Sequence, residues 1–245
     1  MAKTIVFADG LMGLKITKFL LDNFLEDIVM VITTGANEIS SVAESFGVPN
    51  HAFKSTSQLI DSLPERCEVG ILAWWPKVLE RKLVNFPSRG FYNTHPSYLP
   101  YGKGKYPNFW ALVEKTPFGV TVHKVDEGVD TGPIVARREI RHSWLDTGET
   151  LYTRATEAIF ELFKTTYPRI TEGDLVLMPN DQKTGTYHHS SELETASQIM
   201  LDQSYVARDL LNLLRARTFD GFPGCWFIED NVKYEVRINI ERVEP

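Results

Sequence analysis

Short apolar runs alternate with longer segments of mixed polarity in the amino-terminal half of this chain. Thr4 to Ala8, Ile28 to Thr33 and Val69 to Trp74 are runs of five or six mostly apolar residues. Such runs are typical of strands that are buried on both faces of a sheet, and the stretches between them are long enough for helices. Strands that alternate with helices predict an α/β fold built on a Rossmann-like, mainly parallel sheet.

The neighbouring segments predict further elements. An amphipathic helix should follow the turn Asp9 to Gly13 and run through Phe24, and the strand that carries Asn93 should come fourth in this series. The other expected elements are helices at Asn37 to Phe46, Pro76 to about Asn85 and Asn108 to Glu114, a loop from Leu99 to Pro107, strands at Gly119 to Val125 and Ile134 to Ile140, and a long helix after Thr147 to Thr150 that runs to about Tyr167.

Beyond Pro179 the character of the sequence changes. Ala207 to Arg217 has a helical pattern, and Gly224 to Ile240 alternates as short strands around a turn at Glu229 to Asn231. We therefore predict a main domain at residues 1–180 and a small helix and β-hairpin appendage at residues 181–245. A terminal hairpin also offers an unpaired strand edge for self-association.

Composition excludes some classes of protein. The net charge of −6 and the pI near 5.6 argue against a protein that binds a nucleic-acid backbone, because that needs a basic surface. Cys67 and Cys225 lie far apart and form no metal or disulfide motif, which favours a reduced, cytoplasmic protein. We expect no membrane segment, because no apolar stretch approaches the roughly 20 residues that a span needs, and no secretion signal, because the first apolar run is too short.

The most informative motif is Asn93-Thr94-His95-Pro96-Ser97. In a strand, Asn93 and His95 point to the same side, and Pro96 then ends the strand. Crevices at such strand ends bind ligands in open α/β sheets. An amide and an imidazole there suit general-base chemistry with oxyanion stabilisation, although a buried Asn and His can also simply satisfy turn backbone groups.

The residues that follow extend this motif into a longer pattern. Leu99-Pro100, the Gly-Lys-Gly loop, Trp110-Ala111, Gly119-Val120-Thr121 and Asp126-x-Gly-x-Asp-x-Gly132 occur in this order. Residues 91–134 thereby resemble the active-site core of the folate-dependent formyltransferases, and weaker similarity runs from residue 3 to about 170. The resemblance implies the formyltransferase fold, N10-formyltetrahydrofolate as the formyl donor, and no metal.

The resemblance places a catalytic triad on Asn93, His95 and Asp130. The chemistry fits these residue types, because an amine that attacks a formyl carbon must lose a proton and the carbonyl oxygen becomes an oxyanion. His95 suits the base and Asn93 the oxyanion donor, while Asp130 can orient the imidazole. Asp126 is the alternative carboxylate. Asp130 is favoured because the family's catalytic Asp precedes Thr-Gly, and Asp126 is expected to shape the turn.

Ligand contacts are expected at residues that come before and after this triad in the sequence. The family's folate pocket begins at Ala73-Trp74-Trp75-Pro76, where one Trp could pack on a pterin while the other fills the core. The turn after the first strand could hold a phosphate at a helix amino terminus or be an ordinary tight turn. The expected folate contacts are Ala73, Trp74, Trp75, Asp126 and Gly128, and the expected substrate contacts are Asp9, Gly10, Met12, Lys77, Lys105, Tyr106, Arg215, Phe222 and Trp226.

Other candidates carry less weight. Lys103 is a further possible phosphate cation, and His123, His188 and His189 are assigned no role because a structural or exposed position explains them. Phe222 and Trp226 could stack on a base while Arg215 approaches a phosphate, or they could cap the core beside a Gly-Pro turn.

The tail indicates the acceptor amine. From Ser190 onward it holds ten acidic and six basic residues, whereas methionyl-tRNA formyltransferases carry a long basic domain there and glycinamide ribonucleotide enzymes usually end soon after the core. The segments Leu211 to Phe219 and Gly221 to Phe227 are similar to the tail of nucleotide-sugar N-formyltransferases, except that this subgroup more often has Leu at the position of Arg217.

We therefore expect a homodimer, joined through the C-terminal region, that formylates a nucleotide-linked amino-dideoxy sugar. The favoured acceptor is dTDP-4-amino-4,6-dideoxyglucose, used in surface polysaccharide or O-antigen biosynthesis. The alternatives are a GDP-linked amino sugar, glycinamide ribonucleotide, methionyl-tRNA, or a folate- or nucleotide-binding protein without turnover.

Overall fold

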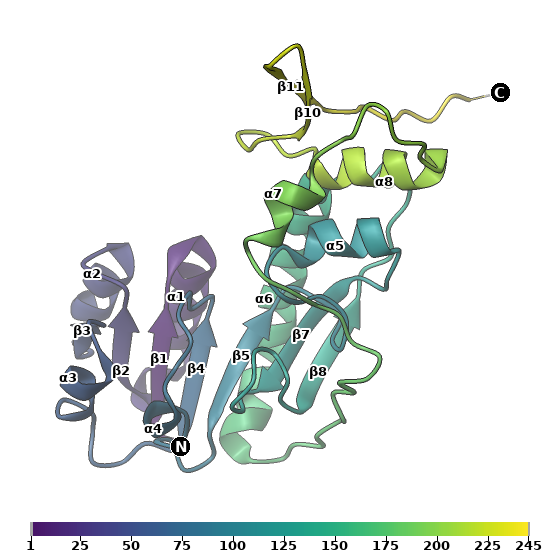
Figure 1. Cartoon of the computed structure of the whole chain (residues 1–245). Coiled ribbons are helices and arrows are strands. Elements are labelled where there is room, and N and C mark those ends of the chain that lie inside the picture. The colour runs from purple at the N-terminus through teal and green to yellow at the C-terminus, as the bar shows by residue number, and fades with distance from the viewer. Residues whose placement is uncertain (1, 245) are drawn as a thin grey trace. The chain divides into compact units, whose positions relative to one another are not determined.

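A seven-stranded sheet organises the computed structural model, which describes residues 2–244. Its strand order is β3-β2-β1-β4-β5-β7-β8 (Figure 1). Neighbouring strands from β3 to β5 are parallel, and β5 pairs with β7 in the antiparallel sense. This confirms the predicted Rossmann-like, mainly parallel sheet. The strands are β1 (Thr4–Ala8), β2 (Ile28–Thr33), β3 (Asn50–Ala52), β4 (Val69–Ala73), β5 (Phe91–His95), β7 (Gly119–Lys124) and β8 (Ile134–Glu139).

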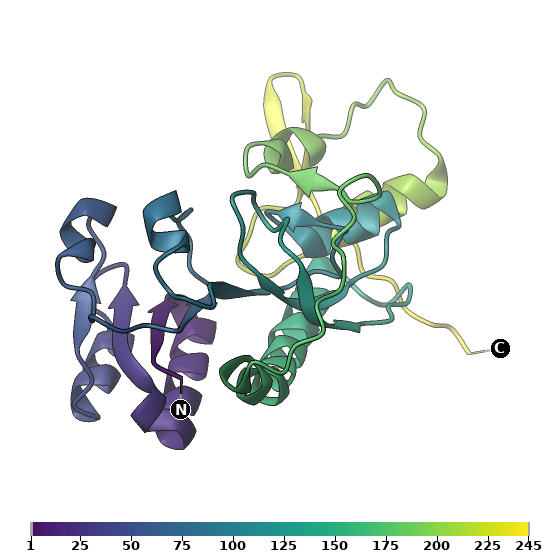
Figure 2. The ribbon, with the colours of Figure 1, turned by 90° about the horizontal axis from the view of Figure 1, so that it is seen from below.

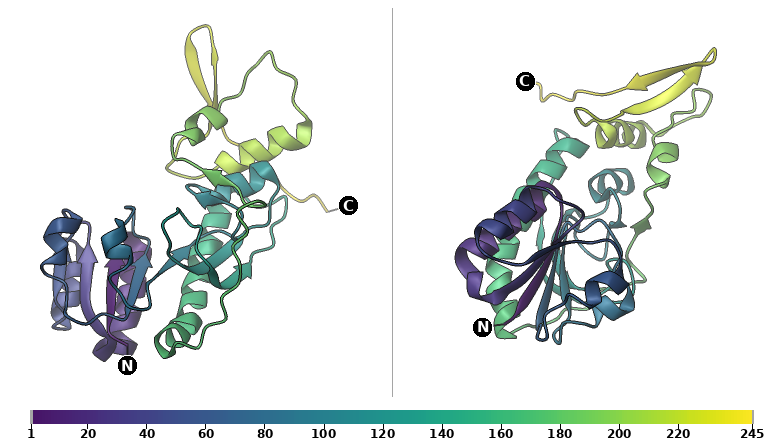
Figure 3. Two further views of the ribbon diagram at one scale, coloured as in Figure 1. Left: turned by 60° about the horizontal axis from the view of Figure 1, so that its bottom comes forward. Right: turned by 90° about the vertical axis from the view of Figure 1, so that its left-hand side faces the viewer.

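Helices cover both faces of the parallel strands (Figures 2 and 3). On one face α1 (Gly10–Phe24) contacts α2 (Glu38–Ser45), and Phe19 of α1 packs edge-on against Phe160 of α6 (Gly148–Glu172). A second core cluster joins side chains of β1, β2, β4 and β5 to Leu59 of α3 (Thr56–Ile60) and Leu83 of α4 (Arg81–Val84). Burial on both faces explains why these strands read as continuous apolar runs.

Close packing between β4 and β5 fixes the strand that carries Asn93 and His95. The register pairs Gly70 with Phe91, and the buried Phe91 ring lies over Gly70, where any Cβ would overlap the ring atoms. Phe91 also meets the ring of Phe7 edge-on, with ring centroids 5.4 Å apart. The aromatic ring thus occupies the space that the glycine leaves, which locks β5 in one register.

The chain divides into two compact units. Unit 1 comprises the described residues up to His95, Thr121–Arg137 and Ala158–Asn180, and unit 2 comprises Pro96–Val120, Arg138–Glu157 and the described residues from Asp181 on. The predicted domain boundary at residue 180 stays a prediction. The remaining elements are η1 (Leu25–Asp27), β6 (Lys103–Gly104), α5 (Pro107–Glu114), β9 (Tyr187–His188), α7 (Glu192–Ala196), α8 (Ala207–Arg217), β10 (Cys225–Glu229) and β11 (Val232–Val236).

The predicted C-terminal hairpin is confirmed, with a two-residue turn. Asp230 and Asn231 have φ angles of 48° and 60°, which is the geometry of a type I′ hairpin turn and suits Asp and Asn. The second strand ends at Val236, before the predicted end at Ile240. Phe227 stacks on Tyr234 across the hairpin, with centroids 5.2 Å apart.

Within unit 2, His188 is held between two carboxylates. Its Nε2 lies 2.7 Å from Glu114 Oε1 and its Nδ1 lies 2.9 Å from Glu192 Oε2, while its ring stacks on Trp110 at 3.6 Å. Carboxylate oxygens only accept, so each ring nitrogen of His188 faces an acceptor. The His189 backbone N–H, with the His188 imidazole, holds the pKa of Glu192 below its usual range. His188 therefore has the structural role that the sequence suggested.

Three further predicted elements have the wrong limits. The strand at Val69 ends at Ala73, because Trp74 adopts a left-handed φ of 54°, and the helix predicted from Pro76 is reduced to Arg81–Val84. Residues 76–78 are exposed, so they offer no apolar face for a helix to bury. The long helix continues past Tyr167 to Glu172 even through Pro168, because Tyr167 and Ile170 are fully buried.

Other elements were not predicted from the sequence. These are η1, β3, α3, β6, β9 and α7, and each is six residues long or shorter. Segments of this length show too little periodicity to be recognised. In the described part of the chain, no helix is both long enough and apolar enough to cross a membrane.

Substituting Gly70→Ala should destabilise the protein, because a Cβ there would force the Phe91 ring aside. Overpacking of this kind costs about 1–3 kcal/mol, which for a chain of this size lowers the melting temperature by about 2–4 °C per kcal/mol. Thermal unfolding followed by circular dichroism measures the change. The control is Gly35→Ala, where a Cβ meets open space. Equal melting temperatures for the two variants would contradict this packing.

Candidate active site

Two adjacent antiparallel strands place four polar side chains on one face of the sheet. Asn93 and His95 are two residues apart on β5, so their side chains point to the same face. The register sets His123 of β7 opposite Asn93 and Thr121 opposite His95. Cross-strand partners lie on the same face of a sheet. The carboxyl end of β5 therefore presents an amide, two imidazoles and a hydroxyl together.

Asp130 completes this cluster from the loop between β7 and β8. Its Oδ2 lies 3.5 Å from His95 Nδ1, and its Oδ1 lies 3.4 Å from His123 Nε2 and 3.3 Å from Asn93 Nδ2. His95, His123 and Asp130 are all buried. The structure thus places the three predicted triad residues together. The interactions of this carboxylate with the Asn93 amide and the His95 imidazole are strong, because solvent screening is weak at buried sites.

Asp126, the alternative carboxylate, is exposed and is used within the loop. Its Oδ1 accepts a hydrogen bond from the Gly128 backbone N–H at 3.1 Å and another from the Thr131 hydroxyl. This agrees with the expectation that Asp126 shapes the turn. Asp126 and Gly128 remain candidates for ligand contact, since both are exposed.

His123 is a member of the cluster that the sequence did not reveal. Its Nδ1 lies 3.0 Å from the Lys124 carbonyl oxygen, which can only accept, so Nδ1 carries hydrogen. In the neutral ring Nε2 then bears the lone pair, and Asn93 Nδ2 lies 3.3 Å from it. The Asn93 amide therefore sits between two acceptors, His123 and Asp130. The register of β5 against β7 creates this contact, and no local pattern encodes that register.

Two further predicted segments meet at the switch point of the sheet. β1 and β4 are neighbours, but β1 is followed by α1 on one face and β4 leads to α4 on the other, and ligands bind at such crevices. The Asp9 backbone N–H donates to the Ala73 carbonyl at 3.2 Å, so the ends of β1 and β4 adjoin. Both segments belong to unit 1, as does the cluster around Asp130.

The comparison with known proteins identifies the family. Residues 3–166 match the family model described as Formyl transferase, and residues 192–242 match an N-formyltransferase dimerization C-terminal domain. The chain belongs to the formyl transferase family. Its Asn93, His95 and Asp130 all fall within the first of these matches.

Individual relatives give the same picture. The chain is 29% identical over 154 residues to dTDP-4-amino-4,6-dideoxyglucose formyltransferase of Mycobacterium bovis, a match that covers 62% of this chain and 65% of that protein. A likely sugar N-formyltransferase from Mycobacterium tuberculosis has the same fold, with a TM-score of 0.84, 22% identity and full coverage of both chains.

A third relative has been solved with ligands. The N-formyltransferase of Helicobacter canadensis, in complex with folinic acid and dTDP-3-aminofucose, superposes with a TM-score of 0.72 at 17% identity. The similarity covers 95% of this chain and 86% of that one. At this level of identity the likeness concerns the fold.

The tryptophan pair predicted at the folate pocket divides between two environments. Trp75 is packed in the core, edge-on against Phe7 and Phe53 with ring centroids 5.2 and 5.5 Å away. Trp74 directly follows β4 and is half-buried. Trp75 therefore packs against the core, and the predicted contact of Trp74 with a ligand stays a prediction. Ala73 is fully buried, and its carbonyl oxygen accepts a hydrogen bond from the Asp9 N–H.

The predicted phosphate loop begins α1. Gly10 has a φ of 61° and is exposed, whereas the whole of Met12 is 1% exposed and so offers almost no surface to an anion. The Asp9 carboxylate accepts a hydrogen bond from the Thr34 hydroxyl rather than capping the helix. Backbone N–H groups at this helix start suit a phosphate. Lys77, also in unit 1, is exposed, with Nζ 5.1 Å from the centroid of the Phe53 ring.

The remaining substrate candidates lie in unit 2. Lys105 and Tyr106 are exposed at the start of α5. Lys103, in contrast, is buried and donates to Gln182 Oε1 at 2.6 Å. Phe222 is exposed, and Trp226 donates its indole N–H to the Glu194 carbonyl. Lys105, Tyr106 and Phe222 therefore have surface that a ligand can reach.

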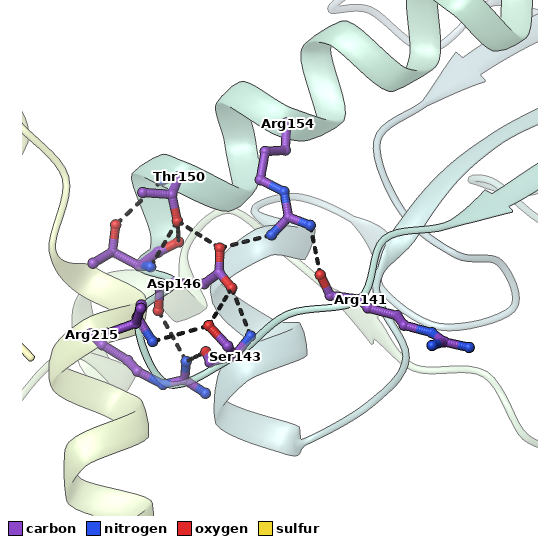
Figure 4. Close-up of polar contacts among 8 residues, drawn as sticks. Arg141, Ser143, Asp146, Thr150, Arg154 and Arg215 are labelled. Carbon is purple, nitrogen blue, oxygen red and sulfur yellow. Dashed lines mark hydrogen bonds and ion pairs between the residues drawn. The ribbon is translucent and has the colours of Figure 1, made fainter. Parts of the chain in front are cut away.

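The Arg215 side chain is hydrogen-bonded within unit 2, so it is not free to bind a ligand (Figure 4). It is 5% exposed, donates from Nη1 to the carbonyls of Ser143 and Asp146, and lies over the Trp144 ring. Its Nε donates to Asn212, and burial lowers the pKa of its guanidinium. Arg215 thus ties α8 to the 143–146 loop, and we leave it out of the proposed phosphate contacts.

Thiol and metal chemistry have no support in the described residues. Burial raises the pKa of Cys67 and of Cys225 to about 12, so neither forms a nucleophilic thiolate near neutral pH. Within residues 2–244, no three His, Cys, Asp or Glu side chains converge where they could hold a metal ion.

Proposed function

We propose that this protein transfers a formyl group from N10-formyltetrahydrofolate to the amine of a nucleotide-linked amino sugar. The observation that carries the proposal is the buried cluster of Asn93, His95 and Asp130 in a chain of the formyl transferase family. The folate complex of the Helicobacter canadensis relative supports the choice of donor. When bound, the folate cosubstrate supplies the formyl carbon.

His95 acts as the general base. Because its Nδ1 faces Asp130, the proton acceptor for the attacking amine is Nε2. Asp130 favours the charged imidazole that results, as a carboxylate beside a catalytic His commonly does. His95 then returns this proton to the departing folate nitrogen, so that the N–H bond broken on the amine is balanced by the one formed on the leaving group.

Asn93 stabilises the negative charge that develops on the formyl oxygen. Its Nδ2 carries two hydrogens and lies 3.3 Å from both His123 Nε2 and Asp130 Oδ1. An oxyanion can compete for one of them because these contacts are long. His123 keeps the amide oriented through the other. A donor of this kind is worth about 2.7–4 kcal/mol in the transition state.

The favoured acceptor is dTDP-4-amino-4,6-dideoxyglucose, as in surface polysaccharide synthesis. The name of the Mycobacterium bovis relative and the acidic tail support this choice. The match covers less than two thirds of that relative, so the acceptor is a proposal about this chain. Exposed Gly10 and Lys77 are the proposed phosphate contacts. Cys67 and Cys225 are free thiols, which suits a cytoplasmic enzyme.

We also propose a homodimer joined through residues 192–242, where the chain matches a dimerization domain. Ile228, Val232 and Tyr234 are about half exposed on the hairpin, at 52%, 49% and 46%. The register places Val232 and Tyr234 on one face of the ribbon and Ile228 on the other, and exposed apolar residues of this kind suit contact with a second copy.

Replacing His95→Ala or Asn93→Ala should each lower kcat by about a hundredfold or more, because each removes one element of transition-state stabilisation. Steady-state formylation assays measure this, and binding of a folate analogue, followed by fluorescence, should be largely kept. The matched control is His189→Ala, an exposed histidine. Turnover within a few-fold of wild type in either variant would reject the assigned roles.

The acceptor class is tested by incubating candidate amines with the folate cosubstrate and following the mass gain of one formyl group. We expect thymidine-linked amino sugars to react, and thymidine diphosphate to raise the melting temperature more than guanosine or uridine diphosphate. Formylation of glycinamide ribonucleotide alone would exclude the sugar assignment. If only a guanosine-linked sugar is formylated, the proposed thymidine nucleotide is wrong, but the acceptor class, a nucleotide-linked amino sugar, stands.

The dimer is tested by light scattering after size exclusion. Wild type should have twice the mass of one chain, and the paired substitution Ile228→Asp with Tyr234→Asp should give monomers, since buried unpaired charges oppose association. Asn231→Asp, at an exposed position in the turn of the same hairpin, is the control for added charge alone. A monomeric wild type at every concentration tested would refute the proposal.

A further inference from the structure

Asn180 donates both of its amide hydrogens to the loop that carries Asp130. Its Nδ2 lies 2.9 Å from the Asp130 carbonyl oxygen and 3.0 Å from the Gly132 carbonyl oxygen. A primary amide has only two such hydrogens, so this group is fully committed to the two carbonyls. Asn180 therefore bridges two backbone positions on either side of Thr131.

A short strand-like bridge fixes the position of Asn180 itself. Ile134 and Met178 exchange two backbone hydrogen bonds, at 2.9 and 2.8 Å, directly beside the loop. Ile134 begins β8, and Met178 lies two residues before Asn180. The side chain thus reaches the loop from a backbone that is anchored to the sheet, and all of these residues belong to unit 1.

The backbone of Asp130 needs such support. Its φ is 54°, in the left-handed region, which costs a residue with a Cβ about 1–2 kcal/mol. That conformation sets the direction of the Cα–Cβ bond and therefore the place of the carboxylate. Contacts to His95, Asn93 and His123 all depend on it, at 3.3–3.5 Å.

We propose that Asn180 is a positioning residue, which holds Asp130 in the left-handed conformation so that its carboxylate faces His95. This inference rests on the proposed function. Asn180 acts on the backbone of Asp130 through the carbonyl oxygen of that residue. Its loss lets the loop relax toward ordinary backbone angles and turns the carboxylate away from the imidazole.

Three substitutions separate the parts of this role. Asn180→Ala removes both donors, and Asn180→Asp keeps the size of the side chain but faces two carbonyl oxygens with acceptor oxygens. Asn180→Gln keeps the amide on a side chain that is longer by one methylene and should restore part of the function. The control is Asn23→Asp, because the exposed Asn23 amide also donates to a carbonyl, that of Phe19 in its own helix.

The Ala and Asp variants should lower kcat by about ten- to hundredfold, the loss expected of a misplaced catalytic group. KM for the folate should change less than about twofold, because binding contacts are kept. The acid limb of the kcat profile should move to lower pH, since an imidazole without its carboxylate is charged less readily. Asp130→Asn should move that limb in the same direction.

A double-mutant cycle identifies the route of the effect. If Asn180 acts through Asp130, Asn180→Ala should cost less than about twofold in the Asp130→Asn background. A full, multiplicative loss in that background would overturn the inference, and so would wild-type kcat in the Ala variant. If the Ala variant shows no cooperative unfolding transition, the Asp and Gln variants take its place in the cycle.

A measurement without turnover separates this inference from the proposed function. The ring-proton resonance of His95 is followed by NMR against pH, and Asn180→Ala and Asp130→Asn should shift its titration midpoint to lower pH, with no shift in Asn23→Asp. An unshifted midpoint in Asn180→Ala would reject the positioning role of Asn180, whatever reaction the enzyme performs. If wild type formylates no amine but the midpoint in Asn180→Ala is shifted as expected, the proposed function is rejected and the positioning role of Asn180 stands.

Discussion

The pairing of β5 with both of its neighbours is the constraint on which the proposed site depends. On one side Gly70 of β4 leaves space for the Phe91 ring, and on the other His123 of β7 lies opposite Asn93. A slip of one residue would turn Asn93 and His95 to the other face of the sheet. The apolar packing at the start of β5 therefore determines where its polar end points.

That polar end holds a carboxylate whose burial has to be offset by partners. An unpaired carboxylate would be costly at this depth, but the Asn93 amide and the His95 imidazole both face Asp130. The Lys124 carbonyl fixes the tautomer of neutral His123, and this orients the Asn93 amide. Such a network is arranged before any substrate binds, which reduces the reorganisation that a reaction requires.

Sequence reasoning succeeded where the information is local. The apolar runs gave the parallel strands, the Asn-x-His spacing gave two residues on one face, and Asp-Asn gave the hairpin turn. It failed where distant segments meet. Nothing near Arg215 in the chain shows that its guanidinium is buried against the 143–146 loop, and the strand at Val69 was predicted one residue too long because a left-handed residue is not visible in an apolar pattern.

By itself the sequence determined the fold class, the family resemblance and three residues suited to formyl transfer, because strand periodicity and motif order are written along the chain. Only the tertiary structure decided that Asp130 rather than Asp126 faces His95, that His123 lies beside them, and that Asn180 donates hydrogen bonds to the loop that carries Asp130. These facts depend on strand register and on a backbone conformation fixed from 50 residues away. Both are set by packing between segments, which no local pattern records.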